Sequence, residues 1–466
     1  MASSQWTDSS SSPGAEATAR LAAHIAGATI DALAPDTLHA FRRSLLDFLT
    51  CAIAGSAMPV SRALLGYFAD TDPSHTATVI GHGTRLSAPN AAFVNGANTH
   101  ALDFDDGHTN ASAHPAGAVF PAVLALAEQL GARVDAADIA LAAVVGYDAM
   151  LRIASAGHPA TARRGFHNTA LAGVFGATAG CARLLQLDAR TTQHALGLAG
   201  SFAGGIREYL DEGAEVKRLH PGKAARDGIV CAELAARGIT GPSRILEGRY
   251  GFFNTHADGE VDWDRLFTGL GTRWEIEDAY FKPYPCCRHY HSIVDGILSL
   301  RARHGFAPAA VERIDIGLYA VGVHGHDHHH YENLLDAQMS APVAAALAVV
   351  DGSLAATSFL PDSLARADVQ RLVALCNTRI DDDCERLYPG RRSGAVVLQV
   401  AGGATLESRV LDPKGEGENP LSDDDLEHKF RTNCEPVVGA AKCDRVLAVV
   451  RGFSRQTPLA ELRRWQ

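Results

Sequence analysis

The chain has 466 residues, of which 47% are hydrophobic and 20% charged, and its formal net charge is -11 at pH 7. A chain of this length exceeds what one hydrophobic core usually supports, so we expect two domains. The negative charge argues against nucleic acid as a partner, and an anionic substrate would need locally concentrated Lys, Arg and His.

The sequence predicts neither a targeting segment nor a disulfide framework. Residues 1–14 are Ser-rich and lack the basic and apolar regions of a signal peptide, so we expect a disordered tail. No apolar run reaches about 18 residues without a polar interruption, so no membrane contact is expected. The nine Cys include no C-x-x-C pair, which is typical of a cytosolic protein and gives no support for structural zinc or an iron–sulfur cluster.

Apolar residues at helical spacing predict a first domain made of helices. The expected helices cover residues 35–55, 91–102, 119–130, 136–156, 169–185 and 191–203. Ala and Gly are frequent in them and favour close helix packing. We therefore expect an all-α domain over residues 15–272.

Near residue 273 the pattern changes to the alternation of half-buried strands. It occurs in residues 274–277 and 311–318, and residues 394–400 and 405–410 predict a hairpin around two glycines. Helices are expected at 340–351 and 362–376, and again over 423–453. We therefore predict a smaller α+β domain, residues 273–412, inserted into the helical domain, to which residues 413–466 return.

The polar stretch from Asn95 to Pro115 is the strongest candidate for a site. It concentrates carboxylates, imidazoles and amides between two predicted apolar helices. If the first helix continues to Asp106, the side chains of Asp103 and Asp106 share a face. Carboxylates at a helix end and a loop that returns His114 suit an acid/base set on a rigid support. The alternative is a solvated helix end with His114 in a turn.

Two further segments combine cations with imidazoles. His167 directly precedes a predicted helix and follows two arginines, although a plain helix flank would explain it equally well. Residues 213–228 hold Lys217, Arg218 and His220 among Gly and Pro. A helix that starts after Gly222 would make this segment an anion cradle, and a solvated charged face is the alternative.

The segment His324 to Tyr331 contains five His and one Asp. Such a run would bind zinc or nickel, and a protein that sequesters metal without catalysis would be the corresponding function. We favour the other interpretation, a substrate-facing or solvated loop.

The chain resembles the MmgE/PrpD family over nearly its whole length. The motifs that carry the resemblance are, in order, residues 45–47, 95–96, 103–106, 114–115, 217–228, 282–288 and 337–340. The resemblance implies a helical domain with an inserted α+β lid, a homodimer, and a site without cofactor or metal in the cleft between the domains. It also implies proton abstraction next to a carboxylate of a small polycarboxylate.

The resemblance also assigns the site. It places Asp103, His114, His167 and Lys217 in the catalytic set, and Arg218, His220, Cys287, Arg288 and His291 among the substrate-binding residues. The chemistry is consistent, because the developing dianion needs fixed cations as well as a base. We expect His114 or His167 to be the base, Asp103 to orient the imidazole, and Lys217 to hold a substrate carboxylate.

Three reactions use these residue types. The leading hypothesis is a lyase that dehydrates a hydroxy-polycarboxylate, in the manner of 2-methylcitrate dehydratase. Epimerisation of an amino- or imino-dicarboxylate such as iminodisuccinate follows, and decarboxylation of the cis-aconitate type is third. Cys287 stands where the decarboxylases have a His. Its thiol would act as the opposite-face acid of an epimerase or, as we favour, pack as a small apolar residue.

Overall fold

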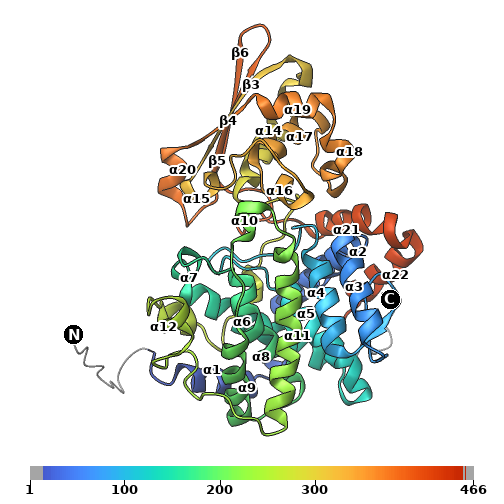
Figure 1. The fold of residues 1–466 in the computed structure, drawn as a ribbon, viewed down its shortest axis with the longest axis vertical. Helices are drawn as coiled ribbons and strands as arrows, with labels where there is room; N and C mark the ends of the chain where they lie inside the picture. Colours follow the sequence, from blue (N-terminus) through green and yellow to red (C-terminus); the bar gives the residue numbers. More distant parts are fainter. Residues whose placement is uncertain (1–13, 455–456, 458–466) are drawn as a thin grey trace, which may run out of the picture.

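The computed structural model describes residues 14–454 and 457, so the tail predicted for residues 1–14 falls outside the described residues except for Gly14. Two hydrophobic cores organise the chain. One core draws on residues between 17 and 281 and between 421 and 453, and the other on residues between 286 and 400. Figure 1 shows the corresponding helical body and α+β body one above the other. The prediction of a mostly helical protein with a smaller mixed α+β part is confirmed.

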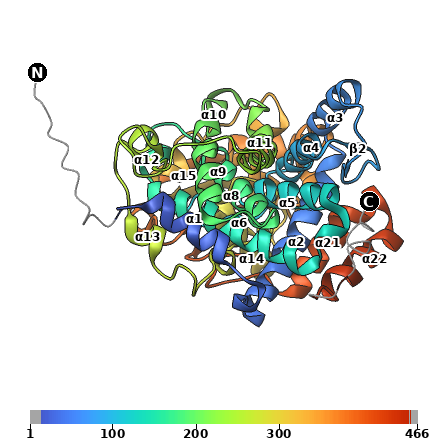
Figure 2. The same ribbon diagram turned by 90° about the horizontal axis from the view of Figure 1, so that it is seen from below.

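The helical body is arranged around α6 (Ala136–Gly157) and α8 (Asn168–Leu184), which lie at its centre in Figure 2. Its other long helices are α1 (Ala17–Gly27), α2 (Pro35–Ser56), α3 (Pro59–Thr71), α4 (Ala88–His100), α5 (Ala116–Leu130), α9 (Ala189–Phe202) and α11 (Val216–Ala236). Shorter ones are α7 (Ala160–Arg163), α10 (Tyr209–Glu212), α12 (Phe252–His256) and α13 (Trp263–Phe267). Helix α6 is apolar and long enough to cross a membrane, but it is enclosed by its neighbours as a core helix.

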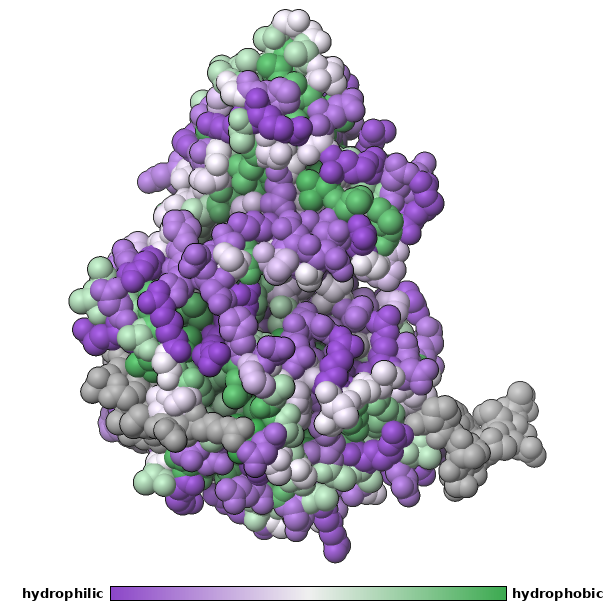
Figure 3. Space-filling view, turned by 180° about the vertical axis from the view of Figure 1, so that it is seen from behind, coloured by the Kyte–Doolittle hydropathy of each residue, from purple (hydrophilic) through white to green (hydrophobic). Residues whose placement is uncertain are grey.

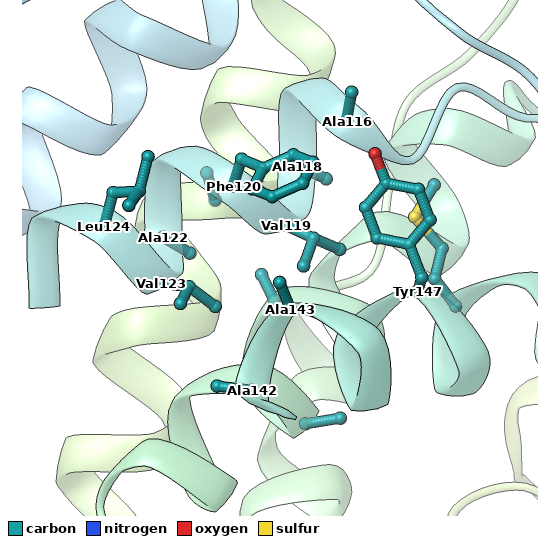
Figure 4. Packing of buried hydrophobic residues seen from close by; sticks show 14 of the residues in the cluster. Ala116, Ala118, Val119, Phe120, Ala122, Val123, Leu124, Ala142, Ala143 and Tyr147 are labelled. Carbon is teal, nitrogen blue, oxygen red and sulfur yellow. The ribbon is translucent and has the colours of Figure 1, made fainter. Parts of the chain in front are cut away.

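Small residues bring the central helices into close contact. In Figure 4, Val119 and Phe120 of α5 lie over Ala143 and Tyr147 of α6. A Cβ atom on Gly146 of α6 would lie 2.9 Å from the carbonyl oxygen of Gly176 in α8. Larger residues would push these helices apart, which supports the packing expected from the Ala- and Gly-rich sequence.

The α+β body contains a four-stranded sheet of order β4-β3-β5-β6. Strand β3 (Val311–Leu318) pairs in parallel with β4 (Cys376–Ile380) and antiparallel with β5 (Gly394–Val400), which forms a hairpin with β6 (Ala404–Val410). The helices of this body are α14 (His291–His304), α15 (Ala320–Val323), α16 (Leu334–Gln338), α17 (Ala341–Asp351), α18 (Pro361–Leu364), α19 (Ala367–Ala374) and α20 (Asp382–Leu387). Strand β3 and the hairpin were predicted correctly.

Several elements differ from the prediction. Residues 274–277 do not form a strand; Glu275–Asp278 is a short 3-10 helix, because four alternating residues do not distinguish the two. The helix expected over 362–376 is divided into α18 and α19, and Cys376 begins β4. Strand β4 and the small hairpin of β1 (Ala77–Thr78) and β2 (Arg85–Leu86) were not predicted, because they are short and partly polar.

The C-terminal helices α21 (Asp423–Val438) and α22 (Ala440–Arg451) pack beside α2, far from the sheet (Figure 1). The Nζ atom of Lys429 in α21 lies 2.6 Å from Oδ1 of Asp47 in α2 and 2.8 Å from the carbonyl oxygen of Phe104. Lys429 and Asp47 are buried. This ion pair therefore joins the end of the chain to α2 and to the loop that contains Asp103.

We expect Lys429→Met to lower the free energy of unfolding by about 3–5 kcal/mol, because Asp47 would lose its counter-charge while staying buried. The double variant Asp47→Leu with Lys429→Met should recover most of this loss, since it removes both charges. Denaturant unfolding followed by circular dichroism measures both variants. A single variant as stable as the wild type would contradict the assigned role of the pair.

Candidate active site

A cavity of about 430 Å³ lies where the two bodies meet. Of the predicted site residues, Asp103, His114, His167, Lys217, Cys287 and Arg288 line it. Figure 1 shows α10, α15 and α16 at this junction, and on the opposite face of the molecule Figure 3 shows mainly hydrophilic residues there. An adjoining cavity of about 580 Å³ has Glu260, Asp262 and Asp264 in its lining and suits an anion poorly.

The loop after α4 separates the two carboxylates that were expected to share a face. Helix α4 ends at His100, and Asp103 has a φ angle of 52°, in the left-handed region that Asp tolerates. The Asp106 carboxylate accepts hydrogen bonds from the Tyr147 hydroxyl at 2.9 Å and from the Ala116 N–H at 3.1 Å. The prediction of a common face is therefore wrong, and only Asp103 lines the cavity.

Asp103 lies between two lysines. The Nζ atom of Lys217 is 2.5 Å from Oδ1, and that of Lys282 is 3.3 Å from Oδ2 and donates to the Asp103 carbonyl oxygen at 2.9 Å. Burial by itself raises the pKa of Asp103, but Lys217 and Lys282 hold it well below its usual range. Two ammonium groups around one carboxylate leave one positive charge for a substrate carboxylate.

Helix α11 places Lys217 in its first turn. The helix begins at Val216, so the prediction of a helix start and anion cradle after Gly222 is wrong. Gly222 serves packing instead, because a Cβ atom there would lie 2.1 Å from the carbonyl oxygen of Phe93 in α4. The close crossing of α4 and α11 brings Lys217 to the Asp103 loop.

His114 is neutral and has one free nitrogen. Its Nδ1 lies 2.5 Å from the carbonyl oxygen of Asp106; a carbonyl only accepts, so Nδ1 carries the proton and Nε2 keeps its lone pair. Burial lowers the pKa of His114 to about 3, with Lys282 and His100 acting in the same direction. The main chain of Asp106, rather than Asp103, therefore orients the ring, which corrects the role expected of Asp103.

His167 is the N-cap residue of α8, and its Nδ1 lies 2.9 Å from Nδ1 of His220. Burial, and then His220 and His100, hold the pKa of His167 well below its usual range. His220 does not line the cavity and supports His167 from behind. One of the two imidazoles must donate to the other, so His167 has a fixed orientation.

Three residues predicted to bind substrate do not line the cavity: Arg218, His220 and His291. Arg218 donates to the Gln338 side chain at 3.1 Å, and His291 lies between Arg288 at 2.8 Å and the Cys286 carbonyl oxygen at 3.2 Å. In this structure the three side chains lie in the wall behind the cavity, and their contact with a substrate stays a prediction. Arg288 reaches the cavity, but its guanidinium also binds the Glu416 carboxylate at 3.0 Å.

Several residues of the cavity wall were not predicted as site residues from the sequence: Arg207, Tyr209, Tyr280, Lys282, His289 and Arg392. Lys282 lies in a motif that signalled the family, whereas Arg207 and Arg392 have no local signal. The cations of the lining are Arg163, Arg207, Lys217, Lys282, Arg288 and Arg392, and among the described lining residues Asp103 is the single carboxylate. The local field is therefore positive although the protein is acidic.

The histidine run does not converge on one point. His326 is buried and lines the cavity, whereas His324 and His330 are exposed. His328 lies 3.1 Å from the Asp336 carboxylate, and His329 lies 3.1 Å from the Cys376 carbonyl oxygen. The run is therefore a loop with one residue, His326, in the cavity wall.

Potential metal donors elsewhere already have cationic neighbours. Within the described ranges, three groups bring donor atoms within 4.8 Å of one another: His100 with Asp103 and Asp105, Cys287 with His289 and His326, and His108 with Glu275 and Asp278. The first group adjoins Lys217, the second has Arg392 3.2 Å from His289, and in the third Arg273 pairs with Asp278. These positive charges oppose a divalent cation, so we assign no metal ligands.

The cavity between the two bodies combines cations with imidazoles, and its charge suits a small anion. The N-terminal domain of the MmgE/PrpD family matches residues 19–264, and its C-terminal domain matches residues 284–454. The chain belongs to the MmgE/PrpD family.

Curated relatives cover nearly the whole chain. The cis-aconitate decarboxylase-like protein oryM of Aspergillus oryzae is 28% identical over 98% of this chain and 98% of its own. The cis-aconitate decarboxylase of Aspergillus terreus is 28% identical over 93% of this chain and 92% of its own. The cis-aconitate decarboxylase of Homo sapiens is 27% identical over 94% of this chain and 91% of its own. These relatives support a lyase-type enzyme of this family.

Proposed function

We propose that this enzyme is a lyase that removes a proton from the carbon next to a carboxylate of a small polycarboxylate, and that it dehydrates a hydroxy-polycarboxylate in the manner of 2-methylcitrate dehydratase. One observation carries the proposal. The free Nε2 of neutral His114 shares a cavity with two lysines that have only one carboxylate between them.

The steps follow from these groups. Lys217 and Lys282 hold the substrate carboxylate and stabilise the negative charge that develops on it as the proton leaves. His114 accepts the proton at Nε2, and the bound anion raises the basicity of the imidazole. His167 and the arginines hold the remaining carboxylates. These steps use only side chains of the protein.

Decarboxylation is the second candidate, and the names of the relatives favour it. Loss of carbon dioxide from a compound such as cis-aconitate would also leave a carbanion that the same lysines stabilise. Cys287 in place of a His is the reason we place dehydration first.

Proton NMR of the purified protein with citrate, 2-methylcitrate, malate, cis-aconitate and iminodisuccinate tests the proposal. We expect signals of an unsaturated product from a hydroxy-polycarboxylate: a vinylic C–H signal from citrate or malate, or a shifted methyl signal on the new C=C bond from 2-methylcitrate. Consumption of cis-aconitate alone, with release of carbon dioxide, would replace the first candidate by the second. Stereochemical inversion of iminodisuccinate without elimination would contradict both and identify an epimerase.

Further features of the proposal concern the whole protein. We infer that the α+β body moves as a lid against the helical body, because the walls of the cavity come from both. The lid predicted over residues 273–412 would then begin after Phe281, because Trp274, Ile276 and Phe281 pack in the helical core.

We also propose that the protein is a homodimer and that it is located in the cytosol. Light scattering coupled to size-exclusion chromatography measures the oligomeric state.

We expect kcat/KM to stay nearly constant between pH 7 and pH 5, where an enzyme with an ordinary histidine as base would lose activity. kcat/KM reports ionisations of the free enzyme, and a base of pKa 6.5 would lose roughly 25-fold between pH 7 and pH 5 as it became protonated. His114, with its pKa lowered to about 3, stays neutral in this window. After correction for substrate ionisation, we expect a change below about twofold. A steep loss toward pH 5 would contradict this account of the base.

A further inference from the structure

Cys287 and His326 form a pair that proton abstraction by His114 does not use. The Sγ atom of Cys287 lies 3.8 Å from Nε2 of His326, and Nδ1 of His326 lies 2.8 Å from the Met339 carbonyl oxygen. Because a carbonyl only accepts, Nδ1 carries the proton and Nε2 accepts from the thiol. Both residues line the cavity, and His326 is 3% exposed.

The pair and His114 belong to different bodies. His114 precedes α5 in the helical body, whereas Cys287 precedes α14 and His326 lies between α15 and α16 in the α+β body. Figure 1 shows α15 and α16 on the α+β side of the junction, with α5 on the other side. A substrate held between the bodies would therefore meet His114 from the helical body and Cys287 from the α+β body.

The sulfur lies in a field set by several elements. The groups that act on it or respond to its charge are Asp103 after α4, Tyr209 in α10, Lys282, Cys286 and Tyr290 in the segment around it, and Tyr319 after β3. Arg207 faces His326. Burial and Asp103 raise the pKa of the Cys287 thiol, but His326, together with a hydrogen bond from the His289 backbone, lowers it to about 7. The pair can therefore exchange its proton near neutral pH.

We propose that Cys287 and His326 are the second proton-transfer group of this site, with the Cys287 thiol giving a proton to the face of the substrate opposite to His114. The inference rests on the proposed function and supplies the acid that elimination requires.

Protons and electrons balance in the proposed elimination. His114 takes the proton from carbon, and the C–H electron pair forms the C=C bond as the C–O bond breaks. The C–O pair leaves with oxygen, which takes the thiol proton and departs as water. The S–H pair stays on sulfur as a thiolate beside His326. The net change in the enzyme is one proton moved from Cys287 to His114, and exchange with solvent restores both groups.

Turnover of the variants gives the first test. We expect Cys287→Ala to lower kcat by about 10²–10⁴-fold with little change in KM, as for loss of a general acid. The matched control is Cys286→Ala, because the neighbouring sulfur is buried and does not line the cavity; it should keep kcat within about threefold. Cys287→Ala with kcat within threefold of the wild type would overturn the proposal.

Alkylation of Cys287 by iodoacetamide, located by peptide mass spectrometry, gives a second test that needs no substrate. In the wild type the rate should reach half its maximum near pH 7, where the thiol titrates, and level off at higher pH. In His326→Gln this point should move to the ordinary value of 9.0 or above. If His326→Gln has the same pH profile of alkylation as the wild type, His326 does not act on the Cys287 thiol and the proposal is overturned. If the wild type turns over no polycarboxylate, the proposed function fails. The alkylation profile still shows whether His326 exchanges a proton with Cys287.

Discussion

Replacing Lys217 with Met is expected to lower kcat/KM by about 10³-fold. Lys217 is 2.5 Å from Asp103, and without it the carboxylate and Lys282 cancel each other. Asp103 and Lys282 together would then offer no net positive charge to the substrate carboxylate or to the dianion that forms from it. We expect kcat to fall and KM to rise together, because both the bound substrate and the transition state lose this cation.

The matched control is Lys223→Met, which removes a lysine from the same helix. Lys223 is partly exposed and pairs with Asp227 at 2.8 Å, outside the cavity. Its kcat/KM should stay within about twofold of the wild type. If Lys217→Met, folded as judged by circular dichroism, loses no more activity than this control, Lys217 does not hold the substrate.

Replacing His114 with Gln is the second large change, with an expected loss of about 10²–10⁴-fold in kcat. Gln can still donate to the Asp106 carbonyl oxygen, so the loop should keep its shape, but it offers no basic nitrogen. KM should change little, because the lysines that bind the carboxylate are untouched. Steady-state kinetics on the substrate found by NMR separate the two parameters.

His39→Gln is the control for this variant, because His39 lies on the outside of α2. It should leave kcat unchanged. If His114→Gln retains more than about a tenth of the wild-type kcat while His167→Gln loses it, His167 is the base and our assignment of His114 is wrong.

The elements that the sequence predicted well have a strong local signal. The alternation in residues 311–318 is long enough to define a strand, and the helical spacing before Gly55 defines α2. Asp103, His114, His167 and Lys217 lie in dense polar motifs within an otherwise apolar domain; composition drew attention to these motifs, and the family resemblance assigned the residues. Their presence in one cavity agrees with that reasoning.

The features that were missed depend on contacts between distant parts of the chain. Gly222 and Pro221 have the local pattern of a helix breaker, yet α11 continues through both, because Gly222 allows the crossing with α4. Lys282 and Arg392 become site residues only when the α+β body meets the helical body. Arg218 and His291 carry the right chemistry for an anion site, but packing directs them into the wall.

Proton abstraction by His114 from the carbon next to a substrate carboxylate is the step on which the proposed function depends. Its most direct measurement is proton NMR of the wild type and His114→Gln with a turned-over polycarboxylate in deuterium oxide. We predict that the C–H signal next to the carboxylate disappears at equilibrium with the wild type, and persists over the same time with His114→Gln. Substrate that the wild type has brought to equilibrium with its product, yet that carries no deuterium at that carbon, would contradict the account.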